Sequence, residues 1–323
     1  MKSNSSNLLF FTFMMIGIII SISSNNWLGC WMGIEINLIS FLPIMMNSVS
    51  VYSSESMIKY FIIQSLGSSL LFFSIMFMLI YNINYLLLIS LLIKMGCPPF
   101  HLWFPSVMEG LTWNNCFLLS TIQKLVPFML MSYLNMNFTL FIITSCLWGS
   151  LGGLMYSSLR KIITYSSIYN LGWIISGIYL MNYSWIIYYI IYSLTLFIMC
   201  YSFNVFGMNY LNQFFLMSMS YTKLMLMMII LLSMGGMPPL LGFFPKMILI
   251  YCLIMNDMTF LCFILLVSAL LVMFFYLRII FTGMMIYSVS LKYIGFSMNW
   301  LFYFFSTMSL FGLLIFSMLI FYF

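Results

Sequence analysis

The sequence predicts an all-α membrane protein, a polytopic bundle of about 11 transmembrane helices. Only 4% of its 323 residues are charged and 65% are hydrophobic, whereas a soluble domain carries about 25% charged residues. Apolar stretches of about 20 residues, the length that crosses a bilayer, recur from one end to the other. These figures exclude a soluble enzyme and a disordered chain, since neither could be built from so few polar side chains.

The expected helices follow one another without a polar domain or a long linker between them. The first is not a secretory signal peptide, because it has a single Lys and no small-residue cleavage site, so residue 1 is expected to be the mature start. The ninth is long and interrupted by prolines. The spans cover residues 4–23, 25–46, 56–80, 84–103, 111–134, 138–157, 163–181, 184–206, 223–255, 258–282 and 299–321. We interpret residues 1–323 as one membrane domain with approximate repeats 4–134 and 138–282 and a C-terminal helix 299–321.

Charged residues between the spans and near their ends predict the orientation of the chain. With 11 spans, seven basic residues fall on the side of the N-terminus and none falls on the other side, whose only charge is Asp257. The positive-inside rule then places the N-terminus in the matrix, or in the cytoplasm of a bacterium. Glu55 and Glu109 are interpreted as solvated loop charges on the basic side. The seven basic residues are Lys2, Lys59, Arg160, Lys161, Lys223, Arg278 and Lys292.

Composition also bears on partners and origin. The net charge of +6 comes from sparse residues that form no patch, so no nucleic-acid partner is expected. The seven cysteines are far apart and include no C-x-x-C pair, which argues against a metal or iron–sulfur site. Met is abundant, whereas Ala occurs once, at Ala269. This bias is typical of an AT-rich organelle genome.

Four further charged residues lie well inside the expected spans, away from the span ends: Glu35, Lys94, Lys124 and Lys246. One charge near the bilayer centre costs roughly 2.5–3.5 kcal/mol, so four unpaired charges would cost about 10 kcal/mol, comparable to the stability of a domain. In a structural interpretation, Glu35 forms a buried ion pair with one lysine, but two lysines then lack an acidic partner. In a functional interpretation, these groups bind and release protons and conduct them through hydrated cavities. The functional interpretation accounts for more of the residues.

A ten-residue motif occurs twice. Residues 96–105 read GCPPFHLWFP and residues 236–245 read GMPPLLGFFP. Each copy has a membrane lysine beside it. Each also has two prolines, which leave backbone carbonyls without a hydrogen-bond donor. Inside a membrane, such a break is tolerated where the backbone lines a wet cavity or is buried in protein. The copies lie in the fourth and ninth helices, which cross the bilayer in opposite directions. This arrangement predicts an inverted five-helix repeat with broken helices, as in transporters.

His101, the single histidine, follows the prolines of the first copy. A lone histidine near a helix end is more often a satisfied polar residue than a proton carrier, but it remains a candidate site residue.

Several stretches together resemble the chain 2 family of mitochondrial NADH–ubiquinone oxidoreductase, respiratory complex I, and most of all its insect members. The likeness runs in order along nearly the whole chain. It is carried by WMGIEINLISFLP (31–43), KMGCPPFHLWFP (94–105), QKLVP (123–127), SSIYNLGW (166–173) and GGMPPLLGFFPK (235–246).

The resemblance implies an antiporter-like, non-redox subunit of the membrane arm of a proton-translocating enzyme. It implies that Glu35, Lys94, Lys124 and Lys246 are its proton-channel residues. NADH, FMN, iron–sulfur clusters and ubiquinone are then expected in other subunits, with no cofactor or metal in this chain. The expected partners are other membrane-arm subunits and the lipid bilayer of the mitochondrial inner membrane, with cardiolipin as a candidate lipid.

One departure from the family pattern is Asn170, where many members have histidine. Asn cannot titrate, so a relay step there would need water or a nearby hydroxyl such as Ser166 or Ser167. Two alternatives to the proton-carrying subunit remain open on the sequence. They are a structural membrane scaffold without proton transfer of its own and a free-standing cation/proton antiporter.

Overall fold

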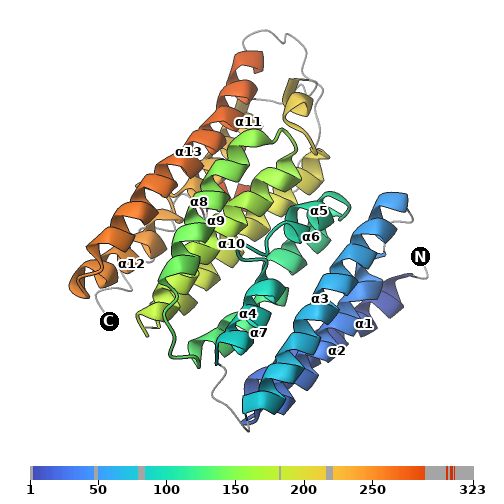
Figure 1. Cartoon of the computed structure of the whole chain (residues 1–323). Coiled ribbons are helices and arrows are strands. Elements are labelled where there is room, and N and C mark those ends of the chain that lie inside the picture. The colour runs from blue at the N-terminus through green and yellow to red at the C-terminus, as the bar shows by residue number, and fades with distance from the viewer. Residues whose placement is uncertain are drawn as a thin grey trace. The chain divides into compact units, whose positions relative to one another are not determined.

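The computed structural model describes residues 3–46, 50–78, 84–181, 183–215, 221–287, 303–304, 306–307 and 309. Within these ranges the chain is helical, with one isolated antiparallel bridge between Ser158 and Tyr210 and no strand. The predicted all-α class is therefore confirmed. The chain forms two compact units, Met1–Asn137 and Phe138–Phe323, whose helices are labelled in Figure 1.

The first unit is built from three long helices and four short ones. Helix α1 packs against α2 where two glycines meet, because a Cβ atom on Gly33 would lie 2.6 Å from the carbonyl oxygen of Gly17. Helix α3 contacts α2, α4 and α5, and α7 contacts α4 and α1. The helices are α1 (Ser3–Ser23), α2 (Trp27–Met45), α3 (Val51–Met78), α4 (Asn84–Met95), α5 (Trp103–Glu109), α6 (Trp113–Ser120) and α7 (Ile122–Ser132).

The second unit is organised around α9, which contacts α8, α10, α12 and α13. All side chains from Ile162 to Ile178 are buried, so the polar residues of α9 face the interior of the unit. Gly149 allows close packing of α8, since a Cβ atom there would lie 2.5 Å from the backbone nitrogen of Tyr169. The elements are α8 (Thr139–Met155), α9 (Leu159–Tyr179), α10 (Ser184–Phe206), the 3-10 helix η1 (Leu211–Phe215), α11 (Tyr221–Gly235), α12 (Phe243–Met255) and α13 (Thr259–Tyr287).

Five of the described helices are long and apolar enough to cross a membrane, namely Ser5–Ser23, Trp27–Met45, Val51–Met78, Ser184–Phe206 and Thr259–Met284. Several of the others are shorter because the expected span is broken.

The expected span 84–103 consists of α4, a turn and the start of α5, and the span 223–255 consists of α11, a turn and α12. The interruption predicted for the ninth span is thus confirmed. The span 111–134 is also divided, at Thr121 between α6 and α7, which the sequence analysis did not predict. The expected helix 299–321 lies almost wholly outside the described residues.

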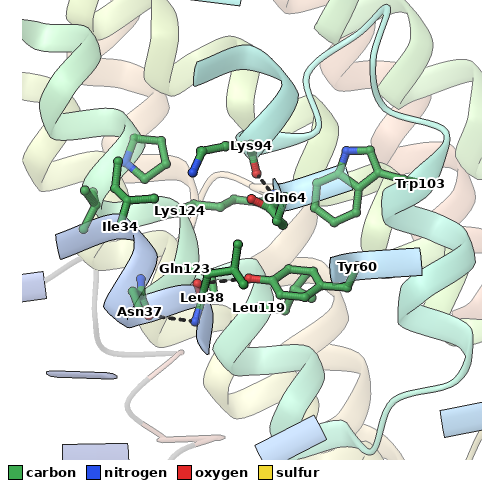
Figure 2. Close-up of a pocket in the computed structure, with 12 residues that line it drawn as sticks. Ile34, Asn37, Leu38, Tyr60, Gln64, Lys94, Trp103, Leu119, Gln123 and Lys124 are labelled. Atoms are coloured by element: carbon green, nitrogen blue, oxygen red, sulfur yellow. Dashed lines mark hydrogen bonds between the residues drawn. The ribbon is translucent and has the colours of Figure 1, made fainter. Parts of the chain in front are cut away.

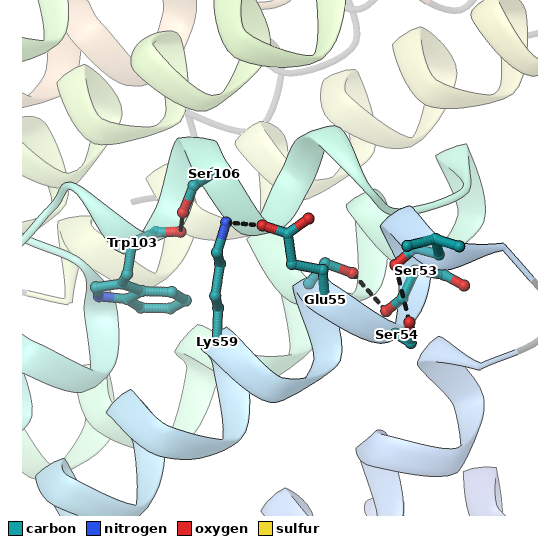
Figure 3. Close-up of polar contacts among 8 residues, drawn as sticks. Ser53, Ser54, Glu55, Lys59, Trp103 and Ser106 are labelled. Carbon is teal, nitrogen blue, oxygen red and sulfur yellow. Dashed lines mark hydrogen bonds and ion pairs between the residues drawn. The ribbon is translucent and has the colours of Figure 1, made fainter.

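The acidic residues assigned to loops belong to helices instead. Glu55 lies in α3, and its Oε1 atom is 2.5 Å from Nζ of Lys59, one helical turn later (Figure 3). Glu109 is the last residue of α5 and is exposed. The loop assignment was therefore wrong, because the helices extend beyond their apolar cores. The Glu55 and Lys59 side chains are about half exposed, and such i, i+4 pairs contribute only about 0.3–0.5 kcal/mol.

Two of the expected basic residues gather at one end of the second unit. Arg278 donates hydrogen bonds to the carbonyls of Leu154 (2.8 Å) and Tyr156 (2.9 Å), where α8 ends. Arg160, near the start of α9, donates to Oδ1 of Asn209 (2.9 Å). A cation suits the C-terminal end of a helix, where free carbonyls concentrate negative charge. Lys2, Lys292 and the side chain of Lys223 lie outside the described residues.

Candidate functional site

Lys94 and Lys124 line one cavity in the first unit. Lys94 lies in the last turn of α4 and Lys124 in the first turn of α7. The cavity has a volume of about 20 Å³, enough for about one water molecule. Figure 2 shows the two side chains near each other, together with the polar groups around them. The lining residues are Ile34, Asn37, Leu38, Tyr60, Gln64, Lys94, Trp103, Leu119, Gln123, Lys124, Val126 and Pro127.

The described residues hydrogen-bond to the backbone of Lys94 but not to its ammonium group. Its side chain is 5% exposed, and Nε2 of Gln64 donates a hydrogen bond to its carbonyl oxygen at 3.1 Å. Gly67 on α3 gives the side chain room, because a Cβ atom there would lie 3.0 Å from Cγ of Lys94. Among the described residues, none forms a hydrogen bond with Nζ of Lys94. The buried cation therefore depends on the cavity for solvation.

Lys124 owes its position to the break between α6 and α7. The hydroxyls of Ser120 and Thr121 donate to the carbonyls of Cys116 and Phe117, both at 2.7 Å, so the break leaves these backbone groups satisfied. Lys124 is 3% exposed. Its Nζ atom lies 4.0 Å from the centre of the Phe104 ring, a cation–π contact. Within the described ranges this ammonium also lacks a hydrogen-bond partner.

One wall of the cavity is a chain of polar side chains from three helices. The hydroxyl of Tyr60 on α3 donates to Oε1 of Gln123 on α7 at 3.3 Å. Nε2 of Gln123 in turn donates to Oδ1 of Asn37 on α2 at 3.0 Å, and both bonds are drawn in Figure 2. These residues and Gln64 were not predicted from the sequence as part of a site. A signal was present, because an amide inside an apolar span is costly unless it meets another polar group.

The other two candidates of the first unit lie outside this lining. Glu35, on α2, is half-buried and close enough for its charge to act on Lys94. No ion pair joins Glu35 to a lysine in the described part of the chain. His101 is buried in the turn between α4 and α5 and is not among the lining residues. The structure thus brings Lys94 and Lys124 to one cavity, with Glu35 within electrostatic range.

The two copies of the repeated motif have the same local conformation. Gly96 and Gly236 both adopt positive φ angles, 69° and 82°, which glycine adopts without the steric cost of a side chain. Each glycine ends a helix in a Schellman arrangement, in which the next residue donates to a carbonyl of the last turn. These bonds run from Cys97 to Leu92 at 3.1 Å and from Met237 to Leu232 at 3.2 Å. The similarity of the two sequences therefore reflects a shared helix break.

Lys246 occupies the break of the second unit. It lies in the first turn of α12, is 6% exposed, and donates from Nζ to the carbonyl of Gly235 at 2.7 Å. The free carbonyls at the end of α11 thus stabilise the cation. Its Nζ atom is also 5.4 Å from the ring centre of Tyr169 and 6.0 Å from that of Trp173. Within the described ranges, Lys246 therefore has a hydrogen-bond partner for its ammonium group, whereas Lys94 and Lys124 have none.

A second cavity of about 20 Å³ adjoins Lys246. Asn170 lines it and is fixed on both sides, donating to the Ser166 carbonyl at 2.9 Å and accepting from the Tyr188 hydroxyl at 2.7 Å. Sequence reasoning singled out Asn170 but not Tyr188, whose contact depends on the packing of α10 against α9. The lining residues are Asn170, Tyr188, Ile191, Tyr192, Thr195, Ser233, Met234, Gly242, Pro245 and Lys246.

The chemistry of the buried lysines is compatible with proton transfer. No group of three histidine, cysteine, aspartate or glutamate side chains in the described ranges could hold a metal ion. A buried lysine next to a water-sized cavity can pass a proton to water and take one back, since both its ammonium and amine forms can hydrogen-bond there.

Comparisons with known proteins agree on the family. The family model described as NADH:quinone oxidoreductase/Mrp antiporter, transmembrane, matches residues 24–84 and 80–272. The NADH-ubiquinone oxidoreductase chain 2 of Anopheles gambiae is 41% identical over 301 residues, which cover 88% of each chain. The protein of the same name from Locusta migratoria is 39% identical over 299 residues, covering 88% of this chain and 86% of that one.

Solved structures show that the fold is shared with more distant proteins. A chain of respiratory complex I from Thermus thermophilus superposes with a TM-score of 0.81 at 18% identity, covering 96% of this chain and 78% of that chain. A chain of the Mrp complex from a Dietzia species gives 0.74 at 15% identity, covering 85% and 59%. Together with the sequence matches, these findings show that the chain belongs to the NADH-ubiquinone oxidoreductase chain 2 family, within the NADH:quinone oxidoreductase/Mrp antiporter transmembrane family.

Proposed function

We propose that this chain is a membrane-arm subunit of a proton-translocating NADH:ubiquinone oxidoreductase, in which Glu35, Lys94, Lys124 and Lys246 carry protons. The observation that supports this most directly is the pair of buried ammonium groups, Lys94 and Lys124, at one cavity of about 20 Å³. Burying two like charges without partners costs several kcal/mol. A cost of this size is typical of charged groups that have a functional role.

The proposal places the chain in the mitochondrial inner membrane, with the N-terminus in the matrix, beside other membrane-arm subunits. The chain takes part in an enzyme without performing its redox chemistry. NADH, FMN, iron–sulfur clusters and ubiquinone would be bound by the other subunits, and quinone reduction there would drive the proton movement here.

The proton steps conserve charge at each stage. A protonated Lys94 gives its proton to water in the cavity and becomes a neutral amine. That water passes a proton to a neutral Lys124, which becomes an ammonium ion, and the water is restored. Glu35 acts on this step through its charge, because a carboxylate attracts the nearby ammonium group of Lys94.

A structural scaffold is the alternative, and it needs an ion pair that ties Glu35 to a lysine. The described residues contain no such pair. Lys246 is the residue that fits a scaffold best, because its bond to Gly235 also closes the helix break. Two of the three buried lysines therefore favour proton transfer, and the third is compatible with both roles.

The test replaces each lysine of the first cavity in the assembled complex and measures proton pumping in sealed vesicles during NADH oxidation. Lys94→Met and Lys124→Met keep the length and apolar stem of the side chain and remove the titrating group. We expect both to lower the number of protons moved per electron pair or the coupled turnover, while the subunit still assembles. Lys59→Met, at an exposed lysine, is the matched control and should pump normally. Normal stoichiometry and turnover in both cavity variants would overturn the proposal.

A further inference from the structure

Buried hydroxyl groups cluster around α9 in the second unit. The residues that carry these hydroxyl groups belong to α9, α10 and α13, and all of them are buried. We refer to them below as the hydroxyl cluster. Its members are Ser166, Ser167, Tyr188, Tyr192 and Tyr276.

The hydroxyl cluster reaches Lys246 through the second cavity. Tyr188 and Tyr192 line this cavity together with Lys246, and α9 contributes Asn170 to the same lining. The Tyr188 hydroxyl donates to Oδ1 of Asn170 at 2.7 Å. A water molecule in the cavity would therefore have polar groups of α9, α10 and α12 around it, as a stable buried water requires.

The cluster continues from the cavity toward the start of α9. The Tyr192 hydroxyl lies near the side chain of Ser167, and the Tyr276 hydroxyl lies near that of Ser166. Neither tyrosine hydroxyl makes a hydrogen bond of normal geometry to any residue in the described ranges. Ser166 and Ser167 lie nearer than Asn170 to the end of α9 that carries Arg160. The hydroxyls thus form a sequence of nearby groups with gaps that bridging water suits.

Packing alone does not explain tyrosine at these positions. A buried hydroxyl without a partner costs about 1–3 kcal/mol, and phenylalanine at 192 or 276 would fill nearly the same space without that cost. Asn170, for its part, cannot bind and release a proton near neutral pH. Any proton that passes this level of α9 must therefore move through hydroxyl groups or water.

We propose that the hydroxyl cluster, apart from Tyr188, conducts protons between Lys246 and the end of the second unit at which α9 begins. The route runs from Lys246 through cavity water and Tyr192 to Ser167, with Tyr276 and Ser166 as a parallel branch. Each hydroxyl accepts a proton on one lone pair and releases its own proton to the next group, so no hydroxyl keeps a charge. Tyr188 is a positioning residue, because its bond fixes the Asn170 amide beside the water. This inference rests on the proton-carrying role proposed for Lys246.

The experiment uses the assembled complex in sealed vesicles and the double variant Tyr192→Phe/Tyr276→Phe. Positioned proton-transfer groups typically contribute about 10²–10⁴-fold in rate. Since water can replace part of a hydroxyl chain, we expect coupled turnover to fall at least tenfold. Assembly should be unchanged, because phenylalanine removes the unpaired hydroxyls and keeps the rings. The matched control is Tyr189→Phe, a buried tyrosine on the same helix that does not line the cavity, and it should retain normal turnover.

Lys246→Met separates failure of this inference from failure of the proposed function. If Lys246→Met lowers coupled turnover and the double tyrosine variant does not, the hydroxyl cluster is not the route and the inference is overturned. If neither variant lowers it, the proton-carrying role of Lys246 is itself wrong. An equal fall in Tyr189→Phe would assign the effect to packing and would also overturn the inference. A fall in the double variant and in Lys246→Met, with a normal control, supports it.

Discussion

Replacing Lys94 or Lys124 by methionine should stabilise the protein even though it removes function. A lysine at membrane depth costs roughly 2.5–3.5 kcal/mol. Removal of the Nζ atom of Lys94 breaks no hydrogen bond to the described residues. Lys94→Met is therefore expected to stabilise the fold by about 2–3 kcal/mol. Lys124→Met also loses the contact of Nζ with the Phe104 ring, 4.0 Å away, which is worth about 0.5–2 kcal/mol. Its net gain should therefore be smaller, about 0–2.5 kcal/mol.

The assay is thermal denaturation of the detergent-solubilised complex, followed by loss of the assembled band on native gels. Both variants should survive to a temperature at least as high as the unmodified protein. Lys59→Met is the control, because it breaks only the exposed pair with Glu55 and should change stability by no more than about 0.5 kcal/mol. The reasoning is refuted if both cavity variants lower the denaturation temperature or prevent assembly. That result would mean that the two ammonium groups hold the fold together.

Three further predictions concern the second unit. Gly236→Ala should displace Lys246, because the added Cβ atom would lie 2.6 Å from Nζ of Lys246. Residue 236 also has a φ of 82°, so denaturant titration should show that the free energy of unfolding falls by about 1–2 kcal/mol. Proton pumping should fall as well. Asn170→Leu leaves the buried Tyr188 hydroxyl without its acceptor, a loss of about 1–3 kcal/mol that Tyr188→Phe in the same chain should largely restore. Gly149→Val drives a side chain against the backbone of α9 and should cost about 1–3 kcal/mol, measured as lower thermal stability; unchanged stability would argue against the close approach of α8 to α9.

The fold class could be predicted from the sequence because it depends on composition. A chain with 4% charged residues can bury its backbone only in helices or a closed barrel if it lies in a membrane. The break of the ninth span was also predictable, since Pro238 and Pro239 cannot donate backbone hydrogen bonds. The break at Thr121 was not, because Ser and Thr are only mildly unfavourable in helices. It becomes stable through hydroxyl bonds to preceding carbonyls, which a pattern of residue types does not reveal.

The candidate site was predictable in its chemistry but not in its arrangement. A lysine within an apolar span is conspicuous in any sequence, so Lys94, Lys124 and Lys246 could be singled out one by one. The first two line one cavity because α7 packs against α4. Their spacing of 30 residues in the sequence does not determine this packing. The Gly235 carbonyl accepts a hydrogen bond from Lys246 because it lies at a helix end, where carbonyls lack a helical partner. The polar wall around Gln123 was missed, because its partners come from helices far apart in sequence.

The central claim is that Lys94 and Lys124 are solvated by water and not by an acidic partner. The most direct measurement is an experimental structure of the assembled complex at a resolution that shows ordered water. We predict a water molecule within about 3 Å of Nζ of at least one of the two lysines, in the cavity that both line. A dry cavity, with the Glu35 carboxylate within about 4 Å of either Nζ atom, would contradict the claim and favour a structural ion pair.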